Sequence, residues 1–125
     1  MSYQIDLAIL DGQTPIEDLK TWLRYADEQR AISIDVLVGY MSPDVQGEWA
    51  KGLKGREVTD ADLDVWRDRI LDWRGVVDAN GAEVPFTTDR RDRLWSVDPK
   101  FRAWLVTEAQ PFDNFRCPRL APPAA

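Results

Sequence analysis

The chain has 125 residues, of which 44% are hydrophobic and 30% are charged, and it carries a net charge of −6. This length suits one domain with its own core, and the composition is that of a globular protein, which excludes wholesale disorder. The acidic balance argues against nucleic acid as a partner, because such binding depends on clustered lysine and arginine. The absence of histidine excludes Ser-His-Asp and Cys-His triads and histidine-ligated zinc sites, so we expect no enzymatic activity.

Two further features concern the cellular compartment. No apolar stretch is long enough to cross a bilayer, and the N-terminal sequence lacks the basic start of a signal peptide, so we expect no membrane association. The single cysteine, Cys117, cannot form an intramolecular disulfide, which fits a reducing cytosol. We therefore expect the protein to act in the cytoplasm.

The N-terminal part predicts a strand followed by a helix. Residues 3–9 alternate between apolar and polar side chains, which is typical of a half-buried strand. Thr14, Pro15 and Glu17 have the pattern of a helix start, with an N-cap, a proline in the first position and a capping-box acid. Apolar residues then recur at helical spacing, so we expect this helix to end near Arg30.

The next segment predicts a second strand and a short helix. Residues 32–38 alternate strictly and are rich in β-branched side chains, which favours a strand. Ser42 and Pro43 predict the start of a short helix, and Gly52 and Gly55 predict its end.

A longer helix is predicted to begin after Thr59, with Asp62 at the capping-box position. Its expected apolar stripe consists of Leu63, Trp66, Ile70 and Trp73. Gly75 follows where a helix end favours a left-handed residue.

Residues 75–86 predict a β-hairpin between the central and C-terminal helices. The turn lies at Asp78 to Gly81, because Asn80 and Gly81 tolerate positive φ angles, and Pro85 suits an edge position.

The same turn has part of the pattern of a calcium loop. Asp78 and Asn80 have the spacing of ligands, but the apolar Val84 and Pro85 follow where ligands should continue. We therefore interpret the segment as a plain β-turn and predict neither a metal ion nor another cofactor.

Two helices are predicted to complete the domain. Thr87 or Thr88 caps the first, and Asp98 precedes the second. Their expected inward-facing residues are Leu94, Trp95, Phe101, Trp104 and Leu105. We predict a mostly helical α+β domain over residues 1–110 with a small sheet, and a Pro-rich tail over residues 111–125 that is mobile or extended along the surface.

The six tryptophans are many for this length. Trp66 and Trp73 fit core positions, whereas Trp22, Trp49 and Trp95 are harder to assign to the core, as is Trp104. Aromatic side chains are enriched at protein interfaces, so we treat Trp22, Trp49 and Trp95 as candidate contacts with a partner.

The segment from Trp73 to Thr87 resembles a known family. Its Trp-x-Gly-Val step, Asn-Gly turn and Val-Pro-Phe-Thr sequence, followed by a helix with a Leu-Trp pair, resemble the small tail assembly chaperones of long-tailed bacteriophages. The matching residues are Trp73, Gly75, Val76, Asp78, Gly81, Val84, Pro85, Phe86 and Thr87. The resemblance extends over roughly residues 32–110.

The resemblance implies a non-enzymatic role in the host bacterial cytoplasm. Proteins of this type hold the aggregation-prone tape measure protein soluble until tail tube subunits displace them. The implied partners are the tape measure protein and the tail tube protein, and self-association into a homo-oligomer stays open. Val84, Pro85 and Phe86 join the tryptophans as candidate contacts.

Three alternatives stay open beside this reading. One is a minor tail or connector protein that remains in the virion. Another is a small acidic phage protein that inhibits a host factor, although acids and bases are mixed along most of the chain. An enzyme that uses carboxylates alone is the third, and no pair of acids in the sequence points to it.

Overall fold

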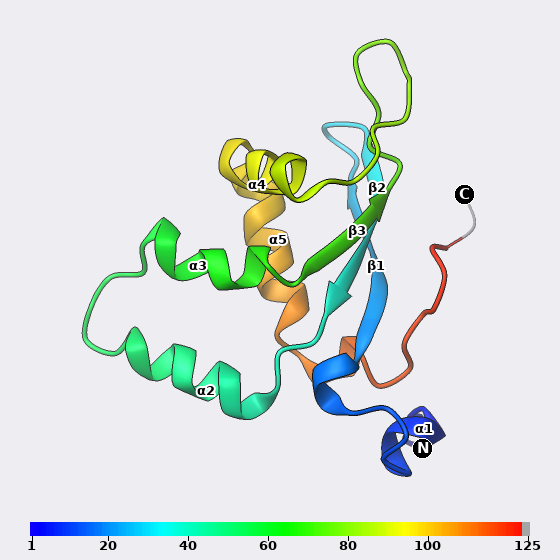
Figure 1. Ribbon diagram of the computed structural model, residues 1–125, viewed down its shortest axis with the longest axis vertical. Helices are drawn as coiled ribbons and strands as arrows, with labels where there is room; N and C mark the ends of the chain where they lie inside the picture. The colour runs from blue at the N-terminus through cyan, green and yellow to red at the C-terminus, as the bar shows by residue number, and fades with distance from the viewer. Residues whose placement is uncertain (124–125) are drawn as a thin grey trace.

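The computed structural model describes residues 1–123 and confirms an α+β fold with a small sheet (Figure 1). The elements in chain order are α1 (Leu7–Leu10), the 3-10 helix η1 (Ile16–Asp18), β1 (Lys20–Asp27), β2 (Ile32–Gly39), α2 (Pro43–Gly52), α3 (Asp60–Arg67), β3 (Ile70–Arg74), α4 (Thr88–Val97), α5 (Pro99–Ala109) and the 3-10 helix η2 (Phe112–Asn114).

The sheet has three antiparallel strands in the order β1-β2-β3. A tight turn joins β1 to β2, in which Ala31 adopts a left-handed φ of 53°. Val36 lies at the centre of the sheet, where it pairs with Leu23 on β1 and with Trp73 on β3. A bulge between Leu37 and Val38 interrupts the second pairing.

The core lies between the sheet and α5. Phe101, Leu105 and Ala109 recur every four residues along α5 and are buried, together with Val36 and Val38 of β2. Burial of each large apolar side chain stabilises the fold by about 1.5–3 kcal/mol. In Figure 1 α5 runs behind the sheet, and α3 and α4 both contact it.

Local signals placed several elements correctly. The strand at β2 is confirmed, as is α2 with Ser42 as its N-cap. Thr59 and Asp62 form the expected capping box at the start of α3. Thr87, rather than Thr88, caps α4, and Asp98 caps α5.

The expected strand at residues 3–9 is wrong. The segment instead contains the short helix α1, whose N-cap Asp6 accepts a hydrogen bond from the amide of Ala8. β1 is an edge strand of the sheet, so a further strand would have to pair with its outer side. The outer edge of β1 is bordered by the C-terminal segment, where the Trp22 amide donates to the carbonyl of Arg119.

The expected helix from Thr14 to Arg30 is also wrong, because the chain forms η1 and then β1 there. The stretch that suggested a helical stripe also contains Leu23 and Tyr25, which alternate as on a strand. Pairing with β2 along all eight residues of β1 satisfies the backbone, so tertiary context decides between the two patterns.

The helix at α3 is shorter than expected and ends at Arg67. Ile70 and Trp73, predicted on its stripe, lie on β3 and are buried there. The two residues lie three apart, which fits a helical face, but the bulge in the pairing with β2 lets both be buried from a strand. Gly75 has the expected positive φ, 88°, although it follows a strand and not a helix.

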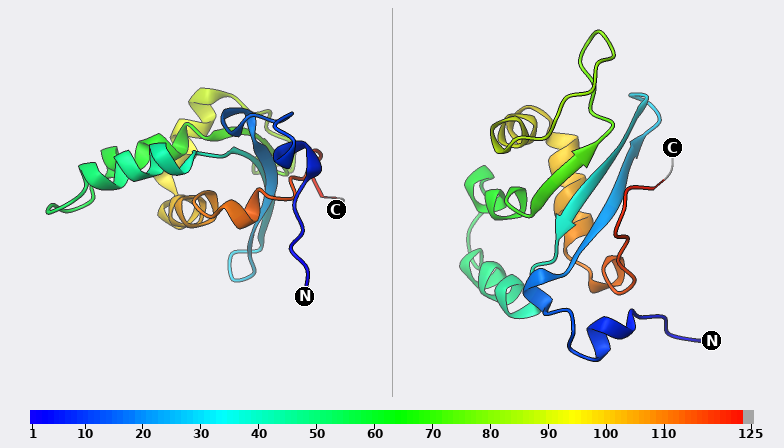
Figure 2. Two further views of the ribbon diagram at one scale, coloured as in Figure 1. Left: turned by 90° about the horizontal axis from the view of Figure 1, so that it is seen from below. Right: turned by 45° about the vertical axis from the view of Figure 1, so that its right-hand side comes forward.

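The hairpin after β3 is confirmed in a minimal form (Figure 2). One bridge joins Val77 to Glu83, and the turn between them contains Gly81 with a φ of 81°. The Asp78 carboxylate accepts hydrogen bonds from the amides of Asn80 and Ala82, which is the geometry of a plain turn.

The C-terminal segment differs from the expected surface tail, because Phe112 packs against the core. Phe115 is fully buried in the same core cluster as α5. The segment then runs beside β1, where the amide of Arg119 donates to the Thr21 hydroxyl at 2.8 Å. Over residues 1–123, none of the helices has the length and hydropathy needed to span a membrane.

Candidate functional site: an apolar pocket below the hairpin

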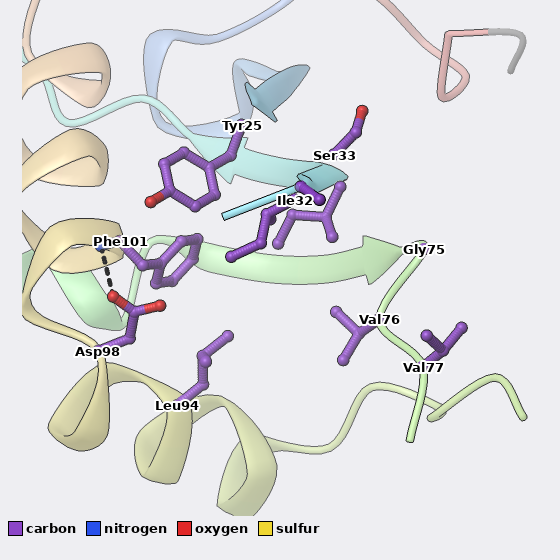
Figure 3. A pocket seen from close by; sticks show the side chains of 11 residues that line it. Tyr25, Ile32, Ser33, Gly75, Val76, Val77, Leu94, Asp98 and Phe101 are labelled. Carbon is purple, nitrogen blue, oxygen red and sulfur yellow. Dashed lines mark hydrogen bonds between the residues drawn. The ribbon is translucent and has the colours of Figure 1, made fainter. Parts of the chain in front are cut away.

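A pocket of about 320 Å³ opens where the hairpin leaves the sheet (Figure 3). It lies between the turn end of β2, the base of the hairpin, α4 and the start of α5. The side chains that make its walls apolar are Ile32, Ile34, Val76, Val77, Leu94 and Phe101. Its volume is near the lower limit of pockets that bind small ligands, about 300–1,000 Å³, so it suits one large apolar side chain.

The pocket exists because β3 is shorter than β2. β3 has five residues and β2 has eight, and the pairing stops at Asp35. Ile32 and Ile34 therefore extend past the last strand pair and have no β3 neighbour. The hairpin and α4 bound the resulting gap, with Leu94 projecting from the first of the two C-terminal helices.

Gly75 makes the close approach of the hairpin to β2 possible. An added Cβ at this position would lie 3.3 Å from the carbonyl oxygen of Ser33 and 3.6 Å from the Cα of Ile34. The left-handed φ of 88° is a second reason for glycine. Gly75 thus determines where Val76 and Val77 stand on the pocket wall.

The rim of the pocket carries a charged network centred on Arg30. The Arg30 guanidinium pairs with Asp98 at 3.0 Å and with Asp27 at 2.8 Å, and it donates to the hydroxyl of Tyr25. The hydrogen bond with Asp27, followed by that with Asp98, raises the pKa of Arg30, and the Arg30 hydrogen bond lowers the pKa of Asp27. Asp98 also accepts from the amide of Phe101 at 3.1 Å, so its carboxylate is engaged twice.

Val84 and Phe86, two of the candidate contacts, brace the hairpin from inside. The Val84 carbonyl accepts a hydrogen bond from the Trp73 indole at 2.8 Å. The Phe86 ring stands edge-on to Trp73 with a centroid distance of 5.2 Å. Pro85 is exposed, and its carbonyl accepts from Arg90. Only Pro85 of the three therefore presents its side chain freely to solvent.

Two of the candidate tryptophans are buried. Trp22 and Trp95 are 5% and 2% exposed, so neither presents a face to solvent in this structure, and their contact with a partner stays a prediction. Trp49 is half-buried, edge-on to Trp66 at 5.3 Å, and donates from its indole to the carbonyl of Asp62. Trp104 is half-buried against Tyr25, which lines the pocket.

The residues of the pocket wall were not predicted as a site. Ile32, Ile34 and Leu94 read as ordinary core positions, because their alternation or helical spacing is that of buried residues. The available signal was the break at Gly75, which shortens the strand after Trp73. That signal gains meaning only once residues 70–74 are known to form a strand.

The geometry offers little for metal-based chemistry among the described residues. Over residues 1–123, no three histidine, cysteine or acidic side chains gather at ligand distance. Cys117 is exposed and unpaired.

The model of the YdaY prophage protein family matches residues 20–121 of the chain. The chain belongs to this family. The match begins at the first residue of β1 and includes the sheet, all the helices after it and most of the C-terminal segment, whereas α1 and η1 precede it. This YdaY family chain is therefore phage-related. Neither the curated proteins nor the solved structures include a significant match.

Proposed function

We propose that this YdaY family protein is a non-enzymatic tail assembly chaperone that binds the tape measure protein before the tail tube polymerises. The apolar pocket below the hairpin carries the proposal. Gly75, Val76 and Val77 of the segment that resembles tail assembly chaperones line it, and most of its wall is apolar. Its single carboxylate, Asp98, is held by Arg30 and a backbone amide, which suits binding and not proton transfer.

The pocket matches one feature expected of the partner. An amphipathic helix docks through a few apolar anchor side chains, and a pocket of this size accepts one of them. The charged rim then faces the polar flank of the helix. The net charge of −6 helps to keep a complex with an aggregation-prone protein in solution.

The test is co-expression with the tape measure protein encoded in the same prophage, followed by size-exclusion chromatography with light scattering. The proposal expects a soluble, stoichiometric complex, with the tape measure protein insoluble when expressed alone. Unchanged solubility of the tape measure protein, and no complex, would contradict it. Detection of the protein in purified virions would favour a minor tail or connector role instead.

A matched pair of variants locates the contact. Val77 lines the pocket and is 55% exposed, and Val97 is 57% exposed but lies outside the pocket. We expect Val77→Asp to weaken the complex at least about tenfold, because it places a charge in an apolar contact. Val97→Asp should leave the complex intact. Equal effects of the two substitutions would show that the pocket is not the contact with the tape measure protein.

A further inference from the structure

A second cavity lies on another part of the surface, and Arg69 is among the residues that line it. It has a volume of about 630 Å³ and lies between η1, the N-terminus of α2 and the end of α3. In Figures 1 and 2, α2 and α3 form an arm beside the sheet. The cavity is lined by the first residues of α2 and by Val65 near the end of α3. The apolar side chains of its lining are Ile16, Met41, Val45 and Val65. Val45 and Val65 are exposed.

The guanidinium of Arg69 is held by backbone atoms alone. Its Nε donates to the carbonyl of Gly39 at 3.1 Å, and its Nη2 donates to the carbonyl of Tyr40 at 2.6 Å. Gly39 makes room for this arrangement, because an added Cβ would lie 2.9 Å from Nη2. A guanidinium has five N–H donors, so the donors of Nη1 have no hydrogen-bond partner within residues 1–123.

Arg69 also lacks a carboxylate partner. No ion pair of the part of the chain that the structure describes includes it. The arginines of similar exposure that do pair with aspartates are Arg67, Arg91, Arg102 and Arg116. Burial lowers the pKa of Arg69, as expected for a cation removed from water without a counter-charge.

The rim of this cavity has the opposite charge. Glu17 and Asp44 are exposed there, and within residues 1–123 neither forms an ion pair. Asp68, also on the lining, is paired with Arg67 and Arg91. The lining therefore combines one cation without a carboxylate partner, several apolar side chains and two carboxylates that form no ion pair within residues 1–123.

We propose that this cavity binds an apolar peptide segment of a partner protein that carries one carboxylate flanked by basic side chains. The carboxylate accepts hydrogen bonds from the free N–H groups of Arg69. The apolar side chains of the segment cover Val45 and Val65, and its basic side chains pair with the acids of the rim. This surface is separate from the pocket below the hairpin, so the proposal does not depend on the tape measure protein.

Charge and hydropathy together select a peptide over an inorganic anion. A small anion would pair with Arg69, but it would leave the apolar walls exposed to water. Glu17 and Asp44 would also repel it. A wholly apolar segment would bury the guanidinium without a counter-charge, which is costly. An apolar segment with a single acid covers the apolar side chains and also supplies a counter-charge for Arg69.

The test is a titration of the full chain, followed by NMR, with synthetic peptides. The set consists of acetylated and amidated leucine peptides with a lysine at each end and one glutamate at successive positions, and the same peptides with glutamine. We expect at least one glutamate peptide to bind about tenfold more tightly than its glutamine counterpart, because a charge-assisted hydrogen bond is lost. The Arg69 Nε–H signal and the Val45 and Val65 methyl signals should shift together.

Two arginine variants separate the site from general electrostatics. Arg69→Met should abolish the preference for glutamate. Arg93→Met should retain it, because Arg93 is an exposed arginine of α4 that forms no ion pair within residues 1–123. If Arg69→Met does not fold, the affinities of the glutamate and glutamine peptides for the unaltered protein still show whether the cavity selects a carboxylate. Equal affinity of the two peptide sets, absence of binding, or a shift of the Arg69 signal by inorganic phosphate equal to that by peptide would each overturn the proposal.

Discussion

Replacement of Phe115 by alanine tests whether the C-terminal segment is part of the core. Phe115 is fully buried, and its ring packs against Tyr40 with a centroid distance of 4.8 Å. Truncation of a buried phenylalanine to alanine costs about 3–5 kcal/mol, which combines lost transfer free energy with the cavity left behind. Total stabilities of such domains are about 5–15 kcal/mol, so the loss is a large share of the whole.

Urea denaturation and thermal unfolding followed by circular dichroism would measure this effect. For a chain of this length we expect the melting temperature to fall by about 15 °C. Leu120→Ala is the matched control in the same segment, since Leu120 is 86% exposed, and it should change stability by less than about 0.5 kcal/mol. A loss below about 1 kcal/mol for Phe115→Ala would refute the inclusion of this segment in the core.

Two further predictions concern backbone strain and pH. Gly75→Ala should destabilise the protein by more than about 1 kcal/mol in urea denaturation, and by more than Gly81→Ala, because both glycines have positive φ but only Gly75 has backbone within 4 Å of the added Cβ. Equal losses would show that the approach to Ser33 does not matter. Hydrogen bonds from Arg56, then from Thr59, lower the pKa of Asp62 in the folded state. The ionised Asp62 therefore stabilises the fold at pH values above the ordinary aspartate pKa of about 3.9. This contribution is lost as the pH falls toward the pKa of the folded state. Asp62→Asn should therefore be less stable than the unaltered protein at neutral pH, with a gap that narrows in acid; a gap independent of pH would contradict this.

The parts of the fold that the sequence predicts correctly are those with local causes. Ser42, Thr59, Thr87 and Asp98 cap helices by accepting hydrogen bonds from the amides three residues further along, and such pairs are visible in a sequence. The strand at residues 32–38 has strict alternation and β-branched side chains, so one pattern fits it best.

The errors arise where distant segments decide the structure. β1 has apolar residues that fit a helix as well as a strand, and its pairing with β2 settles the choice. Ile70 and Trp73 would be buried on a helix as well as on a strand, so their apolar character alone cannot distinguish a helix from a strand. The pocket follows from the difference in length between β2 and β3, and Phe115 reaches the core from a Pro-rich segment whose composition favours the surface.

The proposed function requires the pocket below the hairpin to bind the tape measure protein. The decisive measurement compares amide hydrogen–deuterium exchange rates in the free protein and in the co-purified complex. Binding in the pocket should slow exchange at residues 31–34, 75–77 and 94–101 in the complex and leave the turn of residues 78–81 unchanged. Protection confined to other surfaces, or no complex to measure, would contradict it.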